Sequence, residues 1–160
     1  MRLRLIIDER DRSAWFVDSQ GQKRFKMTDL IQPEHPIIRE IAEGKTVEQI
    51  AEYWRDQFSY DDNPPFRLLA QYVLECPDDF TPSKLIEHIA RTKKADCWGG
   101  STFVASLMIS QGYEASVVLG DMVSIHDERF RWPHAWVSVS VPTEDKPISV
   151  NIFQSGEKNK

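Results

Sequence analysis

The sequence predicts an α+β protein, in which a mainly helical first half precedes a group of antiparallel strands. Two segments, 36–44 and 46–58, carry apolar residues at helical spacing, whereas 135–141 alternates strictly between apolar and polar residues. A further helix over 98–111, followed by strand-like segments, gives an order typical of α+β folds. With 160 residues, the chain has the size of one domain.

The N-terminal part, residues 1–30, predicts a small β element. Residues 2–8 alternate briefly before they run apolar, and 14–18 form a second apolar segment. The turn-like segment 19–22 separates this second segment from 23–27, so two or three short strands are expected. We expect these strands to extend the main sheet or to cap one edge of the domain.

Residues 33–92 are expected to be mainly helical, with a break at 61–65. Thr46 is well placed to cap the helix that follows it, because its side-chain oxygen can accept a free backbone N–H. Apolar residues at helical spacing also predict helices over 66–75 and 83–92. The apolar face of the helix that Thr46 caps comprises Val47, Ile50, Ala51, Trp54 and Phe58.

Residues 95–153 combine the last helix with the predicted sheet. Gly112 follows this helix at the position where a left-handed C-terminal cap belongs. Residues 156–160, at the end of the chain, are expected to be frayed. The predicted strands of the sheet are 115–120, 135–141 and 148–153.

The composition argues against nucleic-acid and membrane partners. The chain has 20 basic and 25 acidic residues, a net charge of −5, and no basic run that would follow a phosphate backbone. No segment approaches the roughly 18 apolar residues of a membrane-spanning helix. Two widely separated cysteines, Cys76 and Cys97, do not form a disulfide scaffold, so a reduced, cytoplasmic protein is expected.

Cys97 is the candidate nucleophile because it lies in the first turn of the predicted helix. Free backbone N–H groups there stabilise an anion, and this placement can lower the pKa of a thiol from about 8.5 to roughly 3.5–7.5. The same groups can receive the oxyanion of a tetrahedral intermediate. Gly99 and Gly100, each costing about 1 kcal/mol in helix propensity, are expected to keep the approach to the sulfur open. The alternative is that Cys97 is an inert core residue, as most free cysteines are.

His134 is the candidate base. It begins the alternating strand, and a strand beside the helix can bring its first residues over the helix N-terminus. Asn151 lies on the next strand, where a hairpin would place it beside His134 and let it orient the imidazole through Nδ1. No Cys–His pair has the spacing of a zinc site, so no metal or cofactor is expected. The other histidines, interpreted as surface or turn residues, are His35, His88 and His126.

Three segments together resemble the transglutaminase-like superfamily, a papain-related group of cysteine enzymes. They are ADCWGGSTFVASLMISQGYEASVVLG at 95–120, HAWVSV at 134–139 and the strand that contains Asn151. The family pattern has Asp before the nucleophile, a helix ending in Gly, a strand ending in Gly and then His-Ala-Trp. The upstream segment WRDQFSYDD at 54–62 is also similar to the family's helix before the nucleophile. The matching positions are Asp96, Cys97, Gly112, Ala115, Gly120, His134, Ala135 and Trp136.

The resemblance implies a papain-like α+β fold, with the nucleophile at a helix N-terminus packed on an antiparallel β-sheet. It also implies a triad of Cys97 as nucleophile, His134 as general base and acid, and Asn151 as the orienting residue. Most of the family has Asp at the third position, so a weaker stabilisation of the imidazolium is expected here. Trp98 and Trp136 are expected to pack or to form the wall of a substrate pocket.

Three functions fit these residues. The simplest is hydrolysis of amide bonds in a protein or peptide substrate, through an acyl-thioester that water resolves. Acyl transfer to an amine, as in transglutaminases, and glutamine deamidation use the same intermediate, although the chain is short for a large cross-linking enzyme. The third function is a non-enzymatic binding module that retains the fold. The sequence predicts no oligomeric state.

Overall fold

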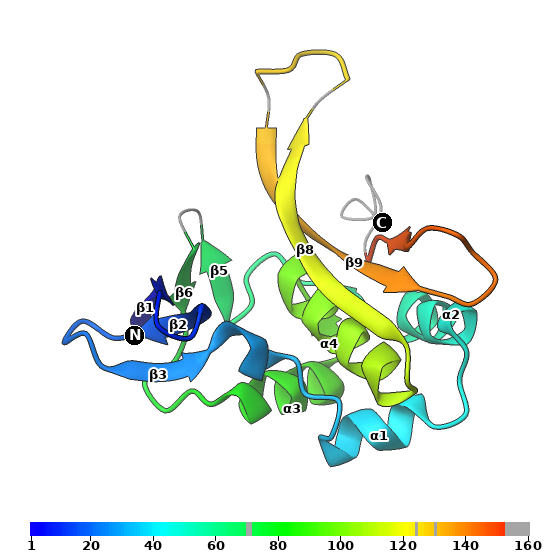
Figure 1. Cartoon of the computed structure of the whole chain (residues 1–160), viewed down its shortest axis with the longest axis horizontal. Helices are drawn as coiled ribbons and strands as arrows, with labels where there is room; N and C mark the ends of the chain where they lie inside the picture. The colour runs from blue at the N-terminus through cyan, green and yellow to red at the C-terminus, as the bar shows by residue number, and fades with distance from the viewer. Residues whose placement is uncertain (70–71, 124, 130, 153–160) are drawn as a thin grey trace.

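The computed structural model describes residues 1–69, 72–123, 125–129 and 131–152, with the backbone alone at 121–123 and 131–133. Figure 1 shows one helix at the centre, a long curved sheet beside it and a second sheet at the N-terminal end. The fold is α+β, as predicted. The helical segments are η1 (Met27–Leu30, a 3-10 helix), α1 (Pro36–Ala42), α2 (Val47–Gln57), α3 (Pro82–Thr92) and α4 (Cys97–Ser110).

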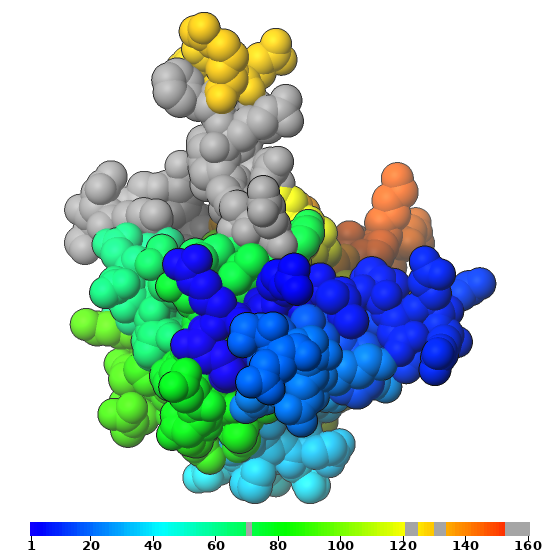
Figure 2. Space-filling view, turned by 90° about the vertical axis from the view of Figure 1, so that its left-hand side faces the viewer, coloured from blue at the N-terminus to red at the C-terminus, as the bar shows by residue number. Residues whose placement is uncertain are grey.

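The N-terminal strands belong to a five-stranded sheet with the order β3-β2-β1-β6-β5. Leu3, Phe16 and Leu74 are completely buried and attach this sheet to the core. The predicted strands are confirmed, but they build a second sheet instead of extending the main one, because β1 pairs with β6 as well as with β2. Figure 2 shows this segment, in blue, across one face of the molecule. The strands are β1 (Arg2–Asp8), β2 (Ser13–Val17), β3 (Lys23–Lys26), β5 (Arg67–Leu69) and β6 (Val73–Glu75).

The helix predicted over 66–75 is wrong, because β5 and β6 lie in this segment and pair with each other antiparallel. Tyr72, directly before β6, has a φ of 57°, which no helix interior accommodates. Pairing of β6 with β1 and burial of Leu74 outweigh the helical spacing of the apolar residues. The prediction that 33–92 is mainly helical therefore fails over this hairpin.

The helix ends follow the predicted capping rules. The hydroxyl of Thr46 accepts from the Gln49 N–H at 3.2 Å, and the Gln49 side chain accepts from the Thr46 N–H at 2.9 Å. Gly112, with a φ of 87°, takes the left-handed conformation expected after α4. The helices predicted over 36–44 and 83–92 are confirmed as α1 and α3.

The main, C-terminal sheet has the order β10-β9-β8 and is antiparallel throughout. The predicted alternation is confirmed, since Ala135, Val137 and Val139 are buried while the residues between them are partly exposed. β8 and β9 continue past the body of the molecule as a projecting hairpin, the yellow arm of Figure 1. The strands are β8 (Glu114–Val123), β9 (Arg131–Ser140) and β10 (Ile148–Val150).

The third predicted strand is shorter than expected. It ends at Val150, after three pairs with β9, and the chain then leaves the ladder at Asn151. Ile152 is again buried, with 2% of its surface exposed. The tail predicted to fray, residues 156–160, lies outside the described residues.

Helix α4 is the centre of the fold. Every residue from 98 to 108 is buried, and the helix packs on α1, α2 and α3 as well as on β8 and β9. A helix that is apolar on all sides is stable only in the interior. Two of its buried hydroxyls bond within the helix: Thr102 donates to the Trp98 carbonyl at 2.9 Å, and Ser106 donates to the Thr102 carbonyl at 2.8 Å. No described helix is both long enough and apolar enough to cross a membrane.

Candidate functional site

Cys97 is the first residue of α4, as predicted, and the chain enters the helix in a fixed geometry. The two residues of β7, Lys94–Ala95, pair in parallel with β4, Ser59–Tyr60. Asp96 is the N-cap, and its carboxylate accepts from the Gly99 N–H at 2.7 Å. The thiol is therefore attached to a helix end that is held by a short sheet before it and by the core after it.

The thiol of Cys97 lies against strand β9, where the backbone N–H of Ala135 donates to the sulfur. Burial raises the pKa of this thiol, and the neighbouring Asp96 carboxylate raises it further. The N–H groups of Ala135, Trp98 and Cys97 lower the pKa, but by less. The expectation that the helix N-terminus lowers the thiol pKa is thus wrong as a net effect, because desolvation exceeds the contribution of the backbone N–H groups.

Asp96 is itself perturbed by its surroundings. Burial raises the pKa of this carboxyl group to about 6, against the opposing effects of the Gly99 N–H and the Arg67 guanidinium. Asp96 therefore carries a negative charge at neutral pH and loses it in mildly acidic solution. Its charge lies next to the nucleophile, where it disfavours the thiolate.

His134 and Asn151 lie side by side, as the hairpin between β9 and β10 was expected to place them. The imidazole Nε2 and the Asn151 Oδ1 are 3.2 Å apart. The expected contact through Nδ1 is wrong, because the side chain of Asn151 reaches the far nitrogen of the ring. Since Oδ1 only accepts, this bond requires the proton on Nε2 and leaves the lone pair of Nδ1 free.

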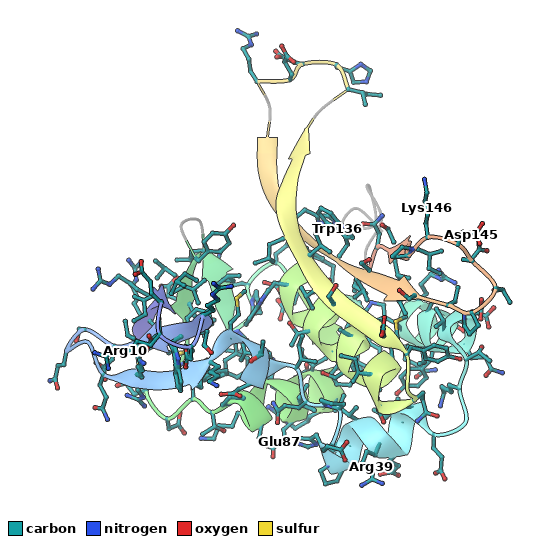
Figure 3. The ribbon with its side chains drawn as sticks, in the orientation of Figure 1. Arg10, Arg39, Glu87, Trp136, Asp145 and Lys146 are labelled. Carbon is teal, nitrogen blue, oxygen red and sulfur yellow. The ribbon has the colours of Figure 1, made fainter. Side chains whose placement is uncertain are left out.

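Trp136 packs beside the imidazole on the same strand. The two rings are stacked, with centroids 5.9 Å apart and planes inclined by 24°. Gly120, paired with His134 across the β8–β9 ladder, makes room for the indole, since a Cβ there would lie 2.9 Å from Trp136 Cη2. Figure 3 shows Trp136 where the curved sheet passes α4, at the base of the projecting hairpin. The indole therefore restricts the orientation of His134.

Gly99 and Gly100 do not keep the approach to the Cys97 sulfur open, as the sequence analysis expected. A Cβ on Gly99 would lie 3.3 Å from Asp96 Oδ1, and one on Gly100 would lie 2.7 Å from Ile152 Cγ2. Both positions face protein atoms and not solvent. The glycines allow close packing around the start of α4, which outweighs their cost in helix propensity.

The side chains of the remaining candidates take no part in the contacts between Cys97, His134 and Asn151 in the described part of the chain. Trp98 is 4% exposed and belongs to the core, so it packs and does not line an open pocket. His35 caps α1 through Nδ1 and pairs with Ser83 on α3, and His88 packs edge-on against Phe66. Among the residues that the structure describes, no three His, Cys, Asp or Glu side chains are grouped as metal ligands.

The structure brings two of the three predicted triad residues, His134 and Asn151, into direct contact. Asn151 bonds to His134, while Cys97 contacts the residue after His134 in β9. In the described part of the chain, the thiol and the imidazole share no hydrogen bond. Catalytic hydrogen bonds are often long in free enzymes and shorten when substrate binds.

Two contributors to the site escaped the sequence analysis. The N–H of Ala135 faces the thiol because β9 passes the start of α4, and Ile152 lies against Gly100 because the chain turns inward after β10. In the sequence, the one signal for the contact between Ile152 and Gly100 is that an apolar residue directly follows Asn151. No protein-family model, curated protein or solved structure matches this chain.

Proposed function

We propose that this protein is a cysteine-dependent amide hydrolase of the transglutaminase-like, papain-like kind, acting on a protein or peptide substrate. The observation that carries the proposal is the arrangement of Cys97 at the start of α4, against the strand in which His134 bonds to Asn151. A base oriented by a third residue and placed beside a thiol is the general signature of nucleophilic catalysis. Both cysteines are free thiols, which agrees with the reducing cytoplasm included in this proposal.

In this mechanism His134 acts as a general base. Nε2–H donates to Asn151, so Nδ1 takes the proton of the Cys97 thiol as the sulfur attacks the amide carbonyl. We assign the oxyanion to the backbone N–H groups that act on the sulfur, those of Cys97, Trp98 and Ala135. The imidazolium then protonates the leaving amine, which leaves an acyl-thioester. Water resolves the thioester, with His134 accepting its proton and the thiol leaving.

The raised pKa of Cys97 defines the resting state in this mechanism. Burial and the Asp96 carboxylate keep the thiol protonated near neutral pH, so proton transfer accompanies attack. A preformed thiolate–imidazolium pair, common in papain-like enzymes, is not expected in the free protein. The reaction then depends on His134 at every pH at which the thiol is protonated.

The second candidate function is a binding module on the same fold. Its support is the same raised thiol pKa together with the lack of a hydrogen bond between Cys97 and His134 in the described residues. Against it, the bond between His134 and Asn151 gives the imidazole a fixed tautomer, which a scaffold does not require.

The deciding experiment is alkylation of Cys97 by iodoacetamide between pH 5 and 10, with Cys76→Ser as the background. We expect His134→Ala to slow labelling at pH 7 by about 10²- to 10⁴-fold, the usual range for loss of a general base. The matched control is His126→Ala, an exposed histidine near the tip of the β8–β9 hairpin, which should leave the rate unchanged. Equal pH profiles for the background and His134→Ala would instead establish the binding module.

A second step then separates hydrolysis from acyl transfer. Product release from a peptide mixture is compared with and without an excess of a small primary amine. Hydrolysis predicts free acid as the product in both cases, because water resolves the thioester. Incorporation of the amine into the peptide would establish the transferase.

A further inference from the structure

Asn151 is exposed, yet it must hold its oxygen on the imidazole of His134. The chain before it is held by the β9–β10 ladder, which ends at Val150. The chain after it is held by Ile152, which is 2% exposed. The position of Asn151 therefore depends on these two neighbours.

Ile152 is seated on the backbone of α4. A Cβ at Gly100 would lie 2.7 Å from Ile152 Cγ2 and 2.7 Å from Trp54 Cζ2, closer than real Cβ atoms come to a neighbour. Both side chains thus contact the helix at Gly100, where the lack of a Cβ leaves room for them. Gly100 lies in the same helical turn as Cys97, and its N–H donates to the Asp96 carbonyl at 2.9 Å.

We propose that Ile152 and Gly100 are positioning residues, which fix Asn151 on His134 by anchoring the end of the C-terminal sheet to the nucleophile's own helical turn. This inference rests on the proposed function and adds to it residues outside the triad. The anchor makes one rigid unit of the nucleophile, the base and the orienting amide. The sequence pattern of this unit is a glycine three residues after the cysteine and an apolar residue directly after the asparagine.

The experiment uses the two side chains that pack against Gly100, those of Ile152 and Trp54. In the Cys76→Ser background, Gly100→Ala should displace Ile152, break the bond from Asn151, and lower the alkylation rate at pH 7 by about 5- to 10-fold. Ile152→Leu removes the Cγ2 methyl at nearly constant volume, and Trp54→Phe removes the opposing Cζ2 atom. We expect Gly100→Ala with Ile152→Leu to recover the rate, and Gly100→Ala with Trp54→Phe to remain slow.

A double-mutant cycle tests whether Gly100 acts through the amide. If it does, Gly100→Ala causes no further loss in an Asn151→Ala background, because the shared interaction is already removed. The proposal would be overturned if the rate losses of Gly100→Ala and Asn151→Ala multiplied in the double variant, or if Trp54→Phe and not Ile152→Leu restored the rate of Gly100→Ala. Gly100 would then serve only the packing of the core. Should Gly100→Ala fail to fold, Ile152→Ala, which introduces no clash, replaces it in the same cycle.

The ring nitrogens of His134 give a readout that does not depend on catalysis. When the imidazole of the native protein is neutral, ¹⁵N NMR should show its proton on Nε2, as the bond to Asn151 requires. Gly100→Ala and Asn151→Ala should both give a mixture of tautomers. A tautomer preference that survives Gly100→Ala overturns the anchor. If the anchor behaves as expected while His134→Ala leaves alkylation unchanged, the proposed function fails and the anchor stands.

Discussion

Cys76 belongs to the hydrophobic core and Cys97 packs against the same core, and burial raises the pKa of both thiols. Cys76 follows β6 in the N-terminal sheet and is 6% exposed, and burial raises its pKa to about 11. Cys97 is more accessible and lies against the backbone N–H of Ala135, one residue from an imidazole. The comparison teaches that burial alone gives an inert thiol, and that a nearby base and backbone donors must offset it.

The two sheets that flank these cysteines also differ in what their ends carry. At the end of the N-terminal sheet, the positive charges of the N-terminus and Arg24 oppose the effect of burial on the Cys76 pKa but do not outweigh it, and no histidine is among the groups that act on this thiol. At the C-terminal sheet, the start of β9 supplies both an N–H and an imidazole, and the residue after β10 supplies an amide oxygen. We therefore predict a reactive thiol at the C-terminal sheet and not at the N-terminal one.

The largest expected effect concerns which thiol reacts. At pH 8 a thiol with a pKa of about 11 is ionised to roughly one part in a thousand, so Cys76 should not react in the folded protein. Cys97→Ser should abolish labelling by iodoacetamide and all turnover, whereas Cys76→Ser should change neither. Mass spectrometry of the labelled peptides is the measurement. Modification of Cys76 in the folded Cys97→Ser variant would remove the distinction between the two regions.

The sequence located this second region well, because its signals are local. The start of a helix at Cys97, the left-handed residue at Gly112 and the alternation around Val137 depend on near neighbours in the chain. The pairing of His134 with Asn151 followed from a single hairpin. Each of these inferences needs only one strand connection or one helical turn.

The first region was predicted less well, because its structure depends on distant pairing. Residues 66–75 have helical spacing, and only contact with β1, more than sixty residues earlier, makes them strands.

The expectation of a lowered Cys97 pKa was wrong for a related reason. Desolvation is set by the whole core around α4, and sequence reasoning weighed only the N–H groups of one helical turn. The seat of Ile152 on Gly100 likewise joins residues that are 52 positions apart.

An intermediate effect is expected for Asp96→Asn, which removes the charge beside the nucleophile. Asparagine keeps an oxygen that can accept the Gly99 N–H, so the helix cap persists. The pKa of Cys97 should fall, and alkylation at pH 7 should rise by up to about 10-fold. Asp145→Asn, in the exposed turn before β10 (Figure 3), removes the same charge away from the thiol and should leave the rate unchanged.

The same substitution should change how stability depends on pH. The pKa of Asp96 is about 6 in the folded protein and close to 4 when unfolded, so the folded state binds the proton more tightly. Stability should therefore fall as pH rises from about 4 to 6, and Asp96→Asn should remove this fall. Urea unfolding at pH 4, 5, 6 and 7 measures the difference, which is of the order of 2–3 kcal/mol at full extent. A difference independent of pH would show that Asp96 is not desolvated.

The smallest expected effect is for Asn151→Asp, which supplies the carboxylate common in the resembled family. A carboxylate that accepts from Nε2–H stabilises the imidazolium that forms when the thiol loses its proton. Alkylation near pH 7 should therefore rise by about two- to fivefold. The gain is small because Asn151 is exposed and water screens the new charge. It should shrink further in 1 M salt, whereas the gain from Asp96→Asn, at a more buried site, should persist. Asn151→Asp that is as slow as Asn151→Ala would mean that position 151 does not act on His134, and the C-terminal sheet would then carry a base without an orienting residue.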